Sequence, residues 1–202
     1  IPLLPLFIFS ILLMDFFQYL QHRFAHKYFW ELHEFHHSAT EMTIFNAKRT
    51  SLLSEIIPQL PFIPILIIAS SFLTRVLDER NYYIILLFFL FEISTEIVGM
   101  LGHSSTKMIY PKPLSYVLLS PSLHWFHHSS NPKHFNKNFG QTFAIWDIIF
   151  GTYYGEEHLS EIKFFGLKHS QYNKYHPLYC YFILPINKLI RKYKFKKFLI
   201  YK

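Results

Sequence analysis

The chain has 202 residues, of which 51% are hydrophobic, 20% aromatic and only 16% charged, and its formal net charge is +7. This length suggests one domain, and so little charge beside so many aromatic residues favours a membrane protein over a soluble one. The single cysteine, Cys180, excludes an internal disulfide and a thiolate-rich metal site. The sequence begins at Ile1 without an initiator methionine, which leaves open that further segments precede it.

Three apolar segments follow one another along the chain, at residues 1–20, 52–74 and 82–101. About 20 helical residues at 1.5 Å each span a hydrocarbon core of roughly 30 Å, so each segment is a candidate membrane span. The first segment lacks the basic region and cleavage site of a secretory signal, so we expect it to remain in the protein.

The second segment contains Pro58, Pro61 and Pro64. Each proline removes a backbone donor, which predicts a helix that is kinked or begins late. The short polar stretch "RVLDER", residues 75–80, separates the second segment from the third. We therefore expect a helical hairpin.

Basic residues are concentrated on one side of this arrangement. Lys and Arg number four in residues 21–51 and fourteen in residues 102–202, against two in the hairpin turn. The positive-inside rule makes the basic side cytoplasmic, so we expect the chain in a bacterial inner membrane or the endoplasmic reticulum. The basic end, residues 188–202, predicts a helix that lies on anionic lipid or is simply solvated. Every histidine falls on the predicted cytoplasmic side.

Eight histidines form three boxes. Their members are His22 and His26 in box 1, His33, His36 and His37 in box 2, and His124, His127 and His128 in box 3. Helical residues three and four apart share a face, so each box predicts imidazoles that point to one place. Box 3 has a clear start, because Ser120 is suited to capping and Pro121 to the first helical position, and Asn131-Pro132 would end the element.

Acidic residues lie in line with these boxes on the predicted helices. Asp15 shares a stripe with His22 and His26, and we expect its carboxylate to accept a hydrogen bond from a histidine N–H. Glu92 and Glu96 precede His103 on the third segment. We expect both acids to face the protein interior, and His103 to be a ninth ligand. We interpret four histidines outside the pattern as surface or outer-shell residues: His134, His158, His169 and His176.

Eight or nine imidazoles exceed what one ion can bind, so the pattern predicts two metal ions. Neutral imidazole suits zinc, copper, iron and nickel, and the residues alone do not separate iron from zinc. A non-redox zinc membrane protein and a metal transporter are the rival classes. A transporter would place its ligands near the bilayer midplane within the spans, whereas these boxes lie at or beyond the span ends.

The flanking residues carry a more specific pattern. "DFFQYLQHRFAH", "HEFHHSATEMTIFNAKRTSLLSEI" and "SPSLHWFHHSSNPKHFNKNFGQTFAIWDIIFGTYY" together resemble the fatty acid hydroxylase/sterol desaturase superfamily of integral membrane di-iron oxygenases over roughly residues 12–155. The triple-proline segment and His134 depart from the pattern of that superfamily.

The resemblance implies an all-α integral membrane helical bundle with a cytoplasmic helical cap that holds a histidine-rich di-metal site. Residues 1–155 would form this domain, with boxes at 22–37 and 124–128, and residues 156–202 a basic amphipathic C-terminal tail. The resemblance implies nine metal ligands: His22, His26, His33, His36, His37, His103, His124, His127 and His128. It assigns supporting roles to Asp15, Asn138 and Asp147, and no catalytic side chain beyond the metal centre. The stripe on the third segment adds Glu96 as a further residue expected to support the site.

The implied activity is hydroxylation or desaturation of a lipid C–H bond. It would use two iron ions, for which zinc can substitute, together with O₂ and two electrons from a separate donor such as cytochrome b5 or ferredoxin with its reductase. No nucleic acid is implied. The boxes leave the lipid class open, and a non-redox zinc-binding protein of the same fold remains the alternative.

Overall fold

The computed structural model describes residues 3–64, 67, 71, 82–168 and 170–200. Their regular structure is helical, and the pairing of extended residues is limited to two isolated bridges, Leu118 with Phe143 and Ser129 with Phe165. The predicted helical class is therefore confirmed for the described residues. None of the helices within these residues combines the length and the apolar character that a membrane crossing requires.

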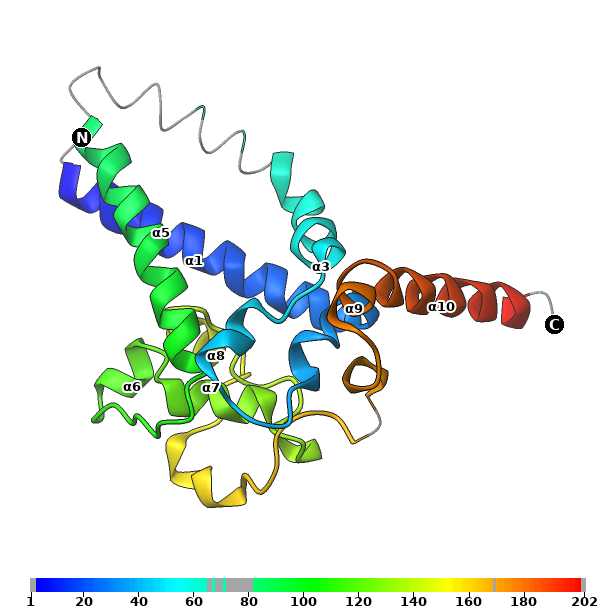
Figure 1. Ribbon diagram of the computed structural model, residues 1–202. Helices are drawn as coiled ribbons and strands as arrows, with labels where there is room; N and C mark the ends of the chain where they lie inside the picture. Colours follow the sequence, from blue (N-terminus) through cyan, green and yellow to red (C-terminus); the bar gives the residue numbers. More distant parts are fainter. Residues whose placement is uncertain (1–2, 65–66, 68–70, 72–81, 169, 201–202) are drawn as a thin grey trace.

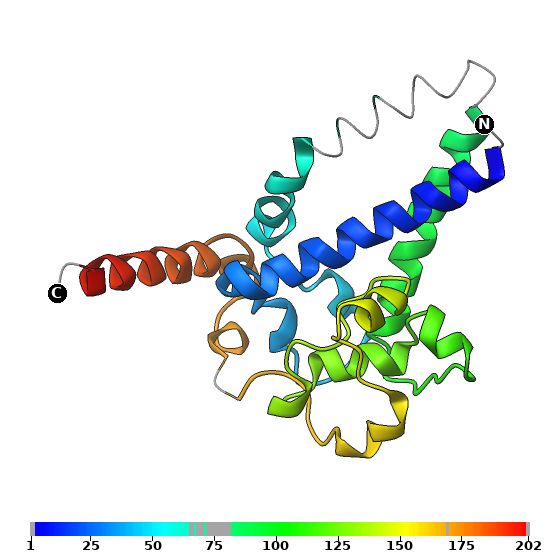
Figure 2. The same ribbon diagram turned by 180° about the vertical axis from the view of Figure 1, so that it is seen from behind.

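Two long helices dominate the architecture (Figure 1). Helix α1 (Leu3–Tyr28) is continuous from the first apolar segment through box 1, and helix α5 (Tyr82–Gly102) covers the third segment. The two helices lie close together at their N-terminal ends and diverge towards their C-terminal ends, as the view from behind also shows (Figure 2). Box 1 and His103 lie near these C-terminal ends, so they enter the rest of the molecule from two directions.

The second apolar segment begins as a short helix that its prolines interrupt. Helix α3 (Leu52–Ile56) starts at Ser51, whose side chain accepts from the Ser54 backbone N–H, and it passes directly into the 3₁₀ helix η3 (Ile57–Phe62). Pro58 and Pro61 lie within η3, as expected for residues that remove backbone donors. The predicted turn at 75–80 lies outside the described residues.

The base of the molecule, around the C-terminal ends of α1 and α5, consists of short elements joined by loops. These are α2 (Trp30–His33), η1 (His36–Ser38), η2 (Ile44–Lys48), α6 (Leu114–Val117), α7 (Pro121–His128), η5 (Pro132–His134), α8 (Ile145–Ile149), η6 (Glu156–Glu161) and η7 (Gln171–Asn173). Helix α5 contacts η2 and α7, while α1 contacts α2 and η3. Boxes 2 and 3 therefore lie between the lower ends of the two long helices.

The C-terminal segment packs on this base before it projects away. Buried side chains of Tyr172, Cys180 and Leu184 form a cluster with Phe35 of box 2. Helices α9 (Pro177–Phe182) and α10 (Leu184–Ile200) follow, and Lys192 of α10 forms an ion pair with Glu31 at 2.7 Å. The predicted tail thus begins as part of the packed base, and only the later turns of α10 extend outwards (Figure 1).

Candidate metal centre

All nine histidines proposed as ligands converge in two adjacent groups. The first group contains His22, His26, His33, His37 and His127, and the second contains His36, His103, His124 and His128. Within each group one ring nitrogen of every member lies within 4.8 Å of those of the others. The described residues contribute no carboxylate or thiol to either group. The pattern of boxes therefore assembles two imidazole sites, as the count of histidines predicted.

Each of boxes 2 and 3 divides its histidines between the two groups. In both boxes the first member is grouped with only one of the adjacent last two: His33 with His37, and His124 with His128. Adjacent residues on a helix differ by about 100° around its axis, because one turn takes 3.6 residues. The expectation that all three histidines of a box point to one place is therefore wrong, since the neighbours face separate sites.

Box 2 is also less regular than predicted. Helix α2 ends at His33, and His36 begins the separate 3₁₀ helix η1. The Arg49 guanidinium donates to Ser38 Oγ from Nε and Nη2, at 3.0 and 2.9 Å, and Ser38 Oγ donates to Phe35 O at 2.7 Å. These bonds tighten the end of the box into a 3₁₀ turn.

Box 3 forms the predicted helix. Helix α7 begins with Pro121, and its N-cap Ser120 accepts a hydrogen bond from the Leu123 backbone N–H at 3.1 Å. The side chains of His124, His127 and His128 are all buried. Capping and a short rigid helix therefore fix the direction of these three imidazoles.

Backbone carbonyls orient one histidine on each of three elements. The Nδ1 atoms of His22, His127 and His103 lie 3.0, 2.9 and 2.6 Å from the carbonyl oxygens of Phe139, Lys137 and Gly99. A proton on Nδ1 satisfies these carbonyls and leaves the Nε2 lone pair free, which is the usual arrangement for a metal-bound imidazole.

Several of the inward-facing nitrogens lack any partner. Nε2 of His22, His33 and His127 is buried without a hydrogen bond. Buried polar atoms normally find partners, so three orphan acceptors in the first group, each beside further imidazoles, fit a bound cation.

The second group shows regular spacing between its ring nitrogens. Nε2 of His103 lies 3.1 Å from His36 Nε2 and 3.2 Å from His124 Nε2, and His128 Nε2 lies 3.1 Å from His124 Nε2. Two nitrogens about 2.1 Å from one ion lie about 3.0 Å apart at a right angle and about 3.4 Å apart at the tetrahedral angle. The observed separations of 3.1–3.2 Å lie between these two values, so one ion could contact these nitrogens in either arrangement.

The environment keeps the imidazoles neutral. Burial lowers the pKa of His22 and of His103 to about 4. Burial is also the main cause that lowers the pKa of the other seven, with neighbouring imidazoles adding to the effect: His26, His33, His36, His37, His124, His127 and His128. Only the neutral imidazole has a lone pair for a metal, so at neutral pH the whole set is ready to bind.

Asp15 does not bind a histidine, contrary to the prediction. Its fully buried carboxylate accepts from the backbone N–H groups of Thr142 and Phe143, at 2.9 and 3.3 Å, and from Trp146 Nε1 at 2.9 Å. Asp15 lies two helical turns before His22, and its carboxylate is hydrogen-bonded to the segment that follows box 3. It therefore fixes that loop against α1, and backbone carbonyls take the histidine protons instead.

Glu96, which was expected to face the protein interior, lines the larger cavity and contacts no histidine of the two groups. Its side chain is 60% exposed and forms an ion pair with Lys48 of η2. Glu92 is partly buried, with a buried Oε1 that lacks a hydrogen bond. The stripe on α5 therefore delivers His103 to the metal centre while Glu96 faces a cavity.

Asn138 and Asp147 support the carbonyls that orient the ligands. Asn138 Nδ2 donates to Leu123 O at 2.8 Å and its Oδ1 accepts from the Tyr154 N–H at 2.8 Å, so the loop is held against α7. The left-handed backbone of Asn138 (φ 52°), which asparagine tolerates better than most residues, lies between the two carbonyls that accept from His127 and His22.

Asp147 holds the other side of the same loop. It is fully buried and accepts from the N–H groups of Phe139 and Gly140, both at 2.8 Å, and from Thr152 Oγ1 at 2.6 Å. A Cβ at Gly140 would lie 2.5 Å from the Phe143 oxygen and 3.0 Å from Asp147 Oδ2, so only glycine allows this close approach. The downstream motif thus supports the site mechanically, as the resemblance implied.

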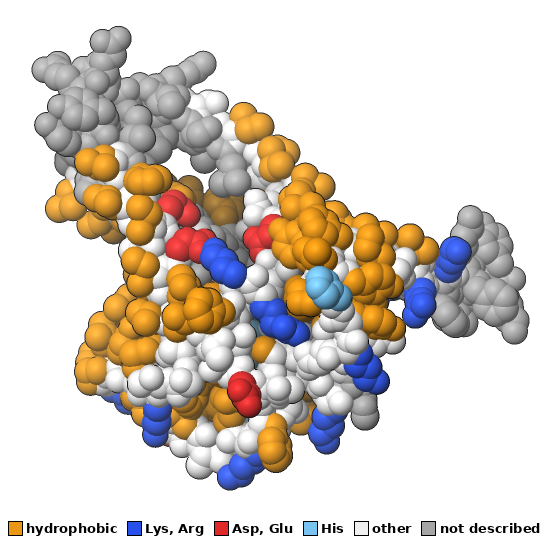
Figure 3. Space-filling model, viewed as in Figure 1, with side chains coloured by type: hydrophobic (Ala, Val, Ile, Leu, Met, Phe, Trp, Pro, Cys, Tyr) orange, Lys and Arg blue, Asp and Glu red, His pale blue; other side chains and the backbone are white. Residues whose placement is uncertain are grey.

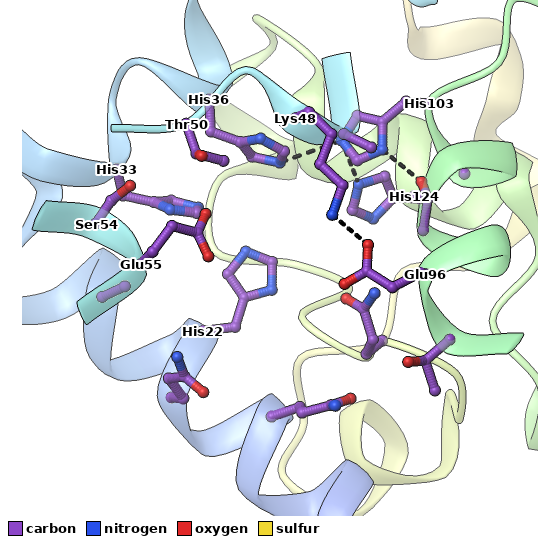
Figure 4. Close-up of a pocket in the computed structure, with 18 of the residues that line it drawn as sticks. His22, His33, His36, Lys48, Thr50, Ser54, Glu55, Glu96, His103 and His124 are labelled. Carbon is purple, nitrogen blue, oxygen red and sulfur yellow. Dashed lines mark hydrogen bonds and ion pairs between the residues drawn. The ribbon is translucent and has the colours of Figure 1, made fainter. Parts of the chain in front are cut away.

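Two cavities open onto the histidines from different sides. The larger, about 570 Å³, is lined by His22, His33, His36, His103 and His124 together with polar side chains of α1, α3 and α5 (Figure 4). The smaller, about 410 Å³, is lined by Trp30, Phe135, His26, His37, His127 and His128. Both groups of imidazoles are therefore reachable by small molecules.

Four further histidines were expected at the surface or in the outer shell, and one of them, His169, lies outside the described residues. His134 is buried, and its Nδ1 lies 2.8 Å from Ser129 Oγ, while His158 lies at the surface beside Glu161. Arg49 and the polar wall of the larger cavity were not predicted. The signal for Arg49 was its place in the "NAKRT" stretch that follows box 2.

Comparison with known proteins places this site in a family. The chain is 32% identical to alkylglycerol monooxygenase of Caenorhabditis elegans over 184 residues, which is 87% of the chain and 32% of that protein. It is 31% identical to the human alkylglycerol monooxygenase over 77% of the chain and 32% of that protein. It is 26% identical to ornithine lipid hydroxylase OlsE of Rhizobium tropici over 72% of the chain and 40% of that protein.

The chain spans about a third of the length of the alkylglycerol monooxygenases that it matches. No solved structure matches it. The model of the fatty acid hydroxylase family, however, matches residues 7–152, which include every histidine of both groups. This chain therefore belongs to the fatty acid hydroxylase family.

Proposed function

We propose that the chain is a membrane-bound oxygenase that holds two iron ions and hydroxylates a C–H bond of a polar lipid. The observation that carries the proposal is the convergence of nine neutral imidazoles in two groups, with a cavity beside them. The relatives support a lipid substrate and favour hydroxylation over desaturation, because their names are those of a monooxygenase and a hydroxylase.

The size of the first group supports iron over a closed zinc site. It offers five imidazoles, whereas a structural zinc site takes four ligands. The absence of any thiol among the ligands of both groups points the same way.

In this proposal a bound iron pair would supply the activation of O₂. The overall reaction consumes one C–H bond, O₂, two electrons and two protons, and it yields an alcohol and water. The electrons come from a separate donor protein. The chain's own residues hold and aim the ligands, through carbonyls at positions 99, 137 and 139 and through the loop that Asp147 fixes. The cavity positions the substrate beside them.

The outer faces of the long helices support a membrane location. Large apolar side chains are exposed on α1 and α5 and on η3, among them Leu4, Phe9, Phe89, Ile97 and Leu60. Orange side chains cover much of this part of the surface in Figure 3. Exposed apolar areas of this kind mark contact with lipid or protein, and a lipid substrate would enter from the bilayer. We propose that the histidines lie at the cytoplasmic side.

The test is a comparison of lipids in a host that expresses the wild type or His127→Ala, with His158→Ala as the matched control. His158 lies outside both groups, and its side chain is 45% exposed. We expect one lipid class to gain an oxygen atom with the wild type and with His158→Ala, and no change with His127→Ala. Equal products from wild type and His127→Ala, at equal expression, would overturn the proposal.

A further inference from the structure

The lining of the larger cavity combines apolar side chains with a group of polar and charged ones. The polar wall that this group forms presents Lys48, Glu55, Glu96, Gln18, Gln21 and Gln141. We propose that this wall binds the headgroup of the lipid, that the headgroup bears N–H or O–H donors, and that the oxidised carbon lies in or next to it. This inference rests on the proposed function and names the substrate class for the same site.

Charged groups stand on two sides of this space. Lys48 and Glu96 form an ion pair on one side, with side chains 65% and 60% exposed, and Glu55 of α3 faces them across the cavity (Figure 4). Glu55 has no ion-pair partner among the described residues, and the three charges sum to −1. Two carboxylates that face one space favour a ligand with hydrogen-bond donors, and they disfavour the carboxylate of a free fatty acid.

The glutamines extend the polar wall towards the metal centre. The Gln18 Oε1 atom is buried without a hydrogen-bond partner, which leaves an acceptor for a donor of the ligand. Gln141 lies against α5, where its Nε2 would be 2.9 Å from a Cβ at position 99, so Gly99 allows its approach.

The polar side chains and the ligands line the same cavity. His22, His33, His36, His103 and His124 share its lining of about 570 Å³ with Gln18 and Glu96. A headgroup held by these polar side chains therefore keeps its own carbons and those next to it beside the metal centre.

The alternative is that the Lys48–Glu96 pair only links η2 to α5. A second exposed ion pair provides the matched control, because Lys112 and Glu157 lie 3.7 Å apart, have side chains 60% and 53% exposed, and do not line the cavity. The decisive variants are Glu55→Gln, which breaks no ion pair, and Glu96→Gln. Glu157→Gln is the control.

The experiment measures binding to the purified chain without a reductant, so that no lipid is consumed. The probes are 1-O-hexadecylglycerol, the hexadecyl ester of ornithine, and palmitate, and binding is followed by the ligand-induced rise in melting temperature. We expect one or both donor-bearing lipids to bind at least tenfold more tightly than palmitate. Glu55→Gln and Glu96→Gln should weaken that binding at least tenfold, and Glu157→Gln should leave it within twofold.

Equal binding of palmitate, or unchanged binding in both Glu55→Gln and Glu96→Gln, would overturn the headgroup site. The preference between the two donor-bearing lipids identifies the donor as hydroxyl or ammonium. Because binding is measured without turnover, its failure is separable from failure of the oxygenase proposal. In active preparations, fragmentation should place the new oxygen in or next to the headgroup, and oxygen in mid-chain would refute the inference.

Discussion

Replacing Asp147 by alanine should loosen the metal centre although Asp147 touches no ligand. The change leaves two buried N–H groups, those of Phe139 and Gly140, without an acceptor, and Thr152 Oγ1 loses its shortest bond. An orphaned buried donor costs about 1–3 kcal/mol, so we expect a loss of about 3–5 kcal/mol in the free energy of unfolding. For a chain of this size that corresponds to a fall of roughly 6–20 °C in melting temperature.

The same change should weaken metal binding, because the Phe139 carbonyl accepts from His22 Nδ1. Loss of such outer support typically costs 10–100-fold in metal affinity. The assay compares melting temperature and bound metal, measured by elemental analysis after dialysis against a weak chelator, for Asp147→Ala, wild type and Glu157→Gln. A fall of less than about 2 °C with full retention of metal in Asp147→Ala would refute the reasoning.

Three further outcomes follow from the same contacts. His124→Ala and His127→Ala each remove a ligand from a different group, so elemental analysis should find about one ion per chain in each variant against about two in the wild type; full occupancy in either would contradict the division. The lowered pKa of His22 and His103, about 4 against the usual 6.5, makes the metal-free chain most stable above pH 6.5. Its free energy of unfolding should fall by about 3 kcal/mol for each group as the pH drops from 6.5 towards 4, and its melting temperature should fall with it; a flat profile would contradict burial of neutral imidazoles. Arg49→Lys should reduce metal affinity 10–100-fold, because lysine lacks the planar fork that holds Ser38, and metal titration checks it.

The sequence predicted the ligands better than their arrangement. Spacing within the boxes identified eight of the nine histidines of the two groups, the place of His103 at the end of the third apolar segment identified the ninth, and the Ser120–Pro121 start of α7 was correct. Local signals sufficed there, because helix periodicity and capping act over a few residues. How each box divides between two sites depends on the positions of α1, α5 and α7 in space, and no single box contains that information.

Polar partners were the weaker part of the prediction. Asp15 was expected to hold a histidine because both lie on one stripe of α1, yet it holds the loop at 142–146. The partner is 127 residues away in sequence, and backbone N–H groups leave no trace in side-chain patterns. The carbonyls that accept from His22 and His127 were unpredictable for the same reason. The polar wall of the larger cavity likewise exists only where three helices meet.

The most direct test of the central claim is incorporation of oxygen from O₂ into lipid. Iron-loaded chain in bilayer nanodiscs, supplied with a chemical reductant and 1-O-hexadecylglycerol or the hexadecyl ester of ornithine under oxygen-18 gas, is analysed by mass spectrometry. The account predicts one labelled oxygen in the lipid product, dependent on iron and on reductant and absent in His127→Ala. Product without label, or labelled product at the same level in His127→Ala, would contradict it.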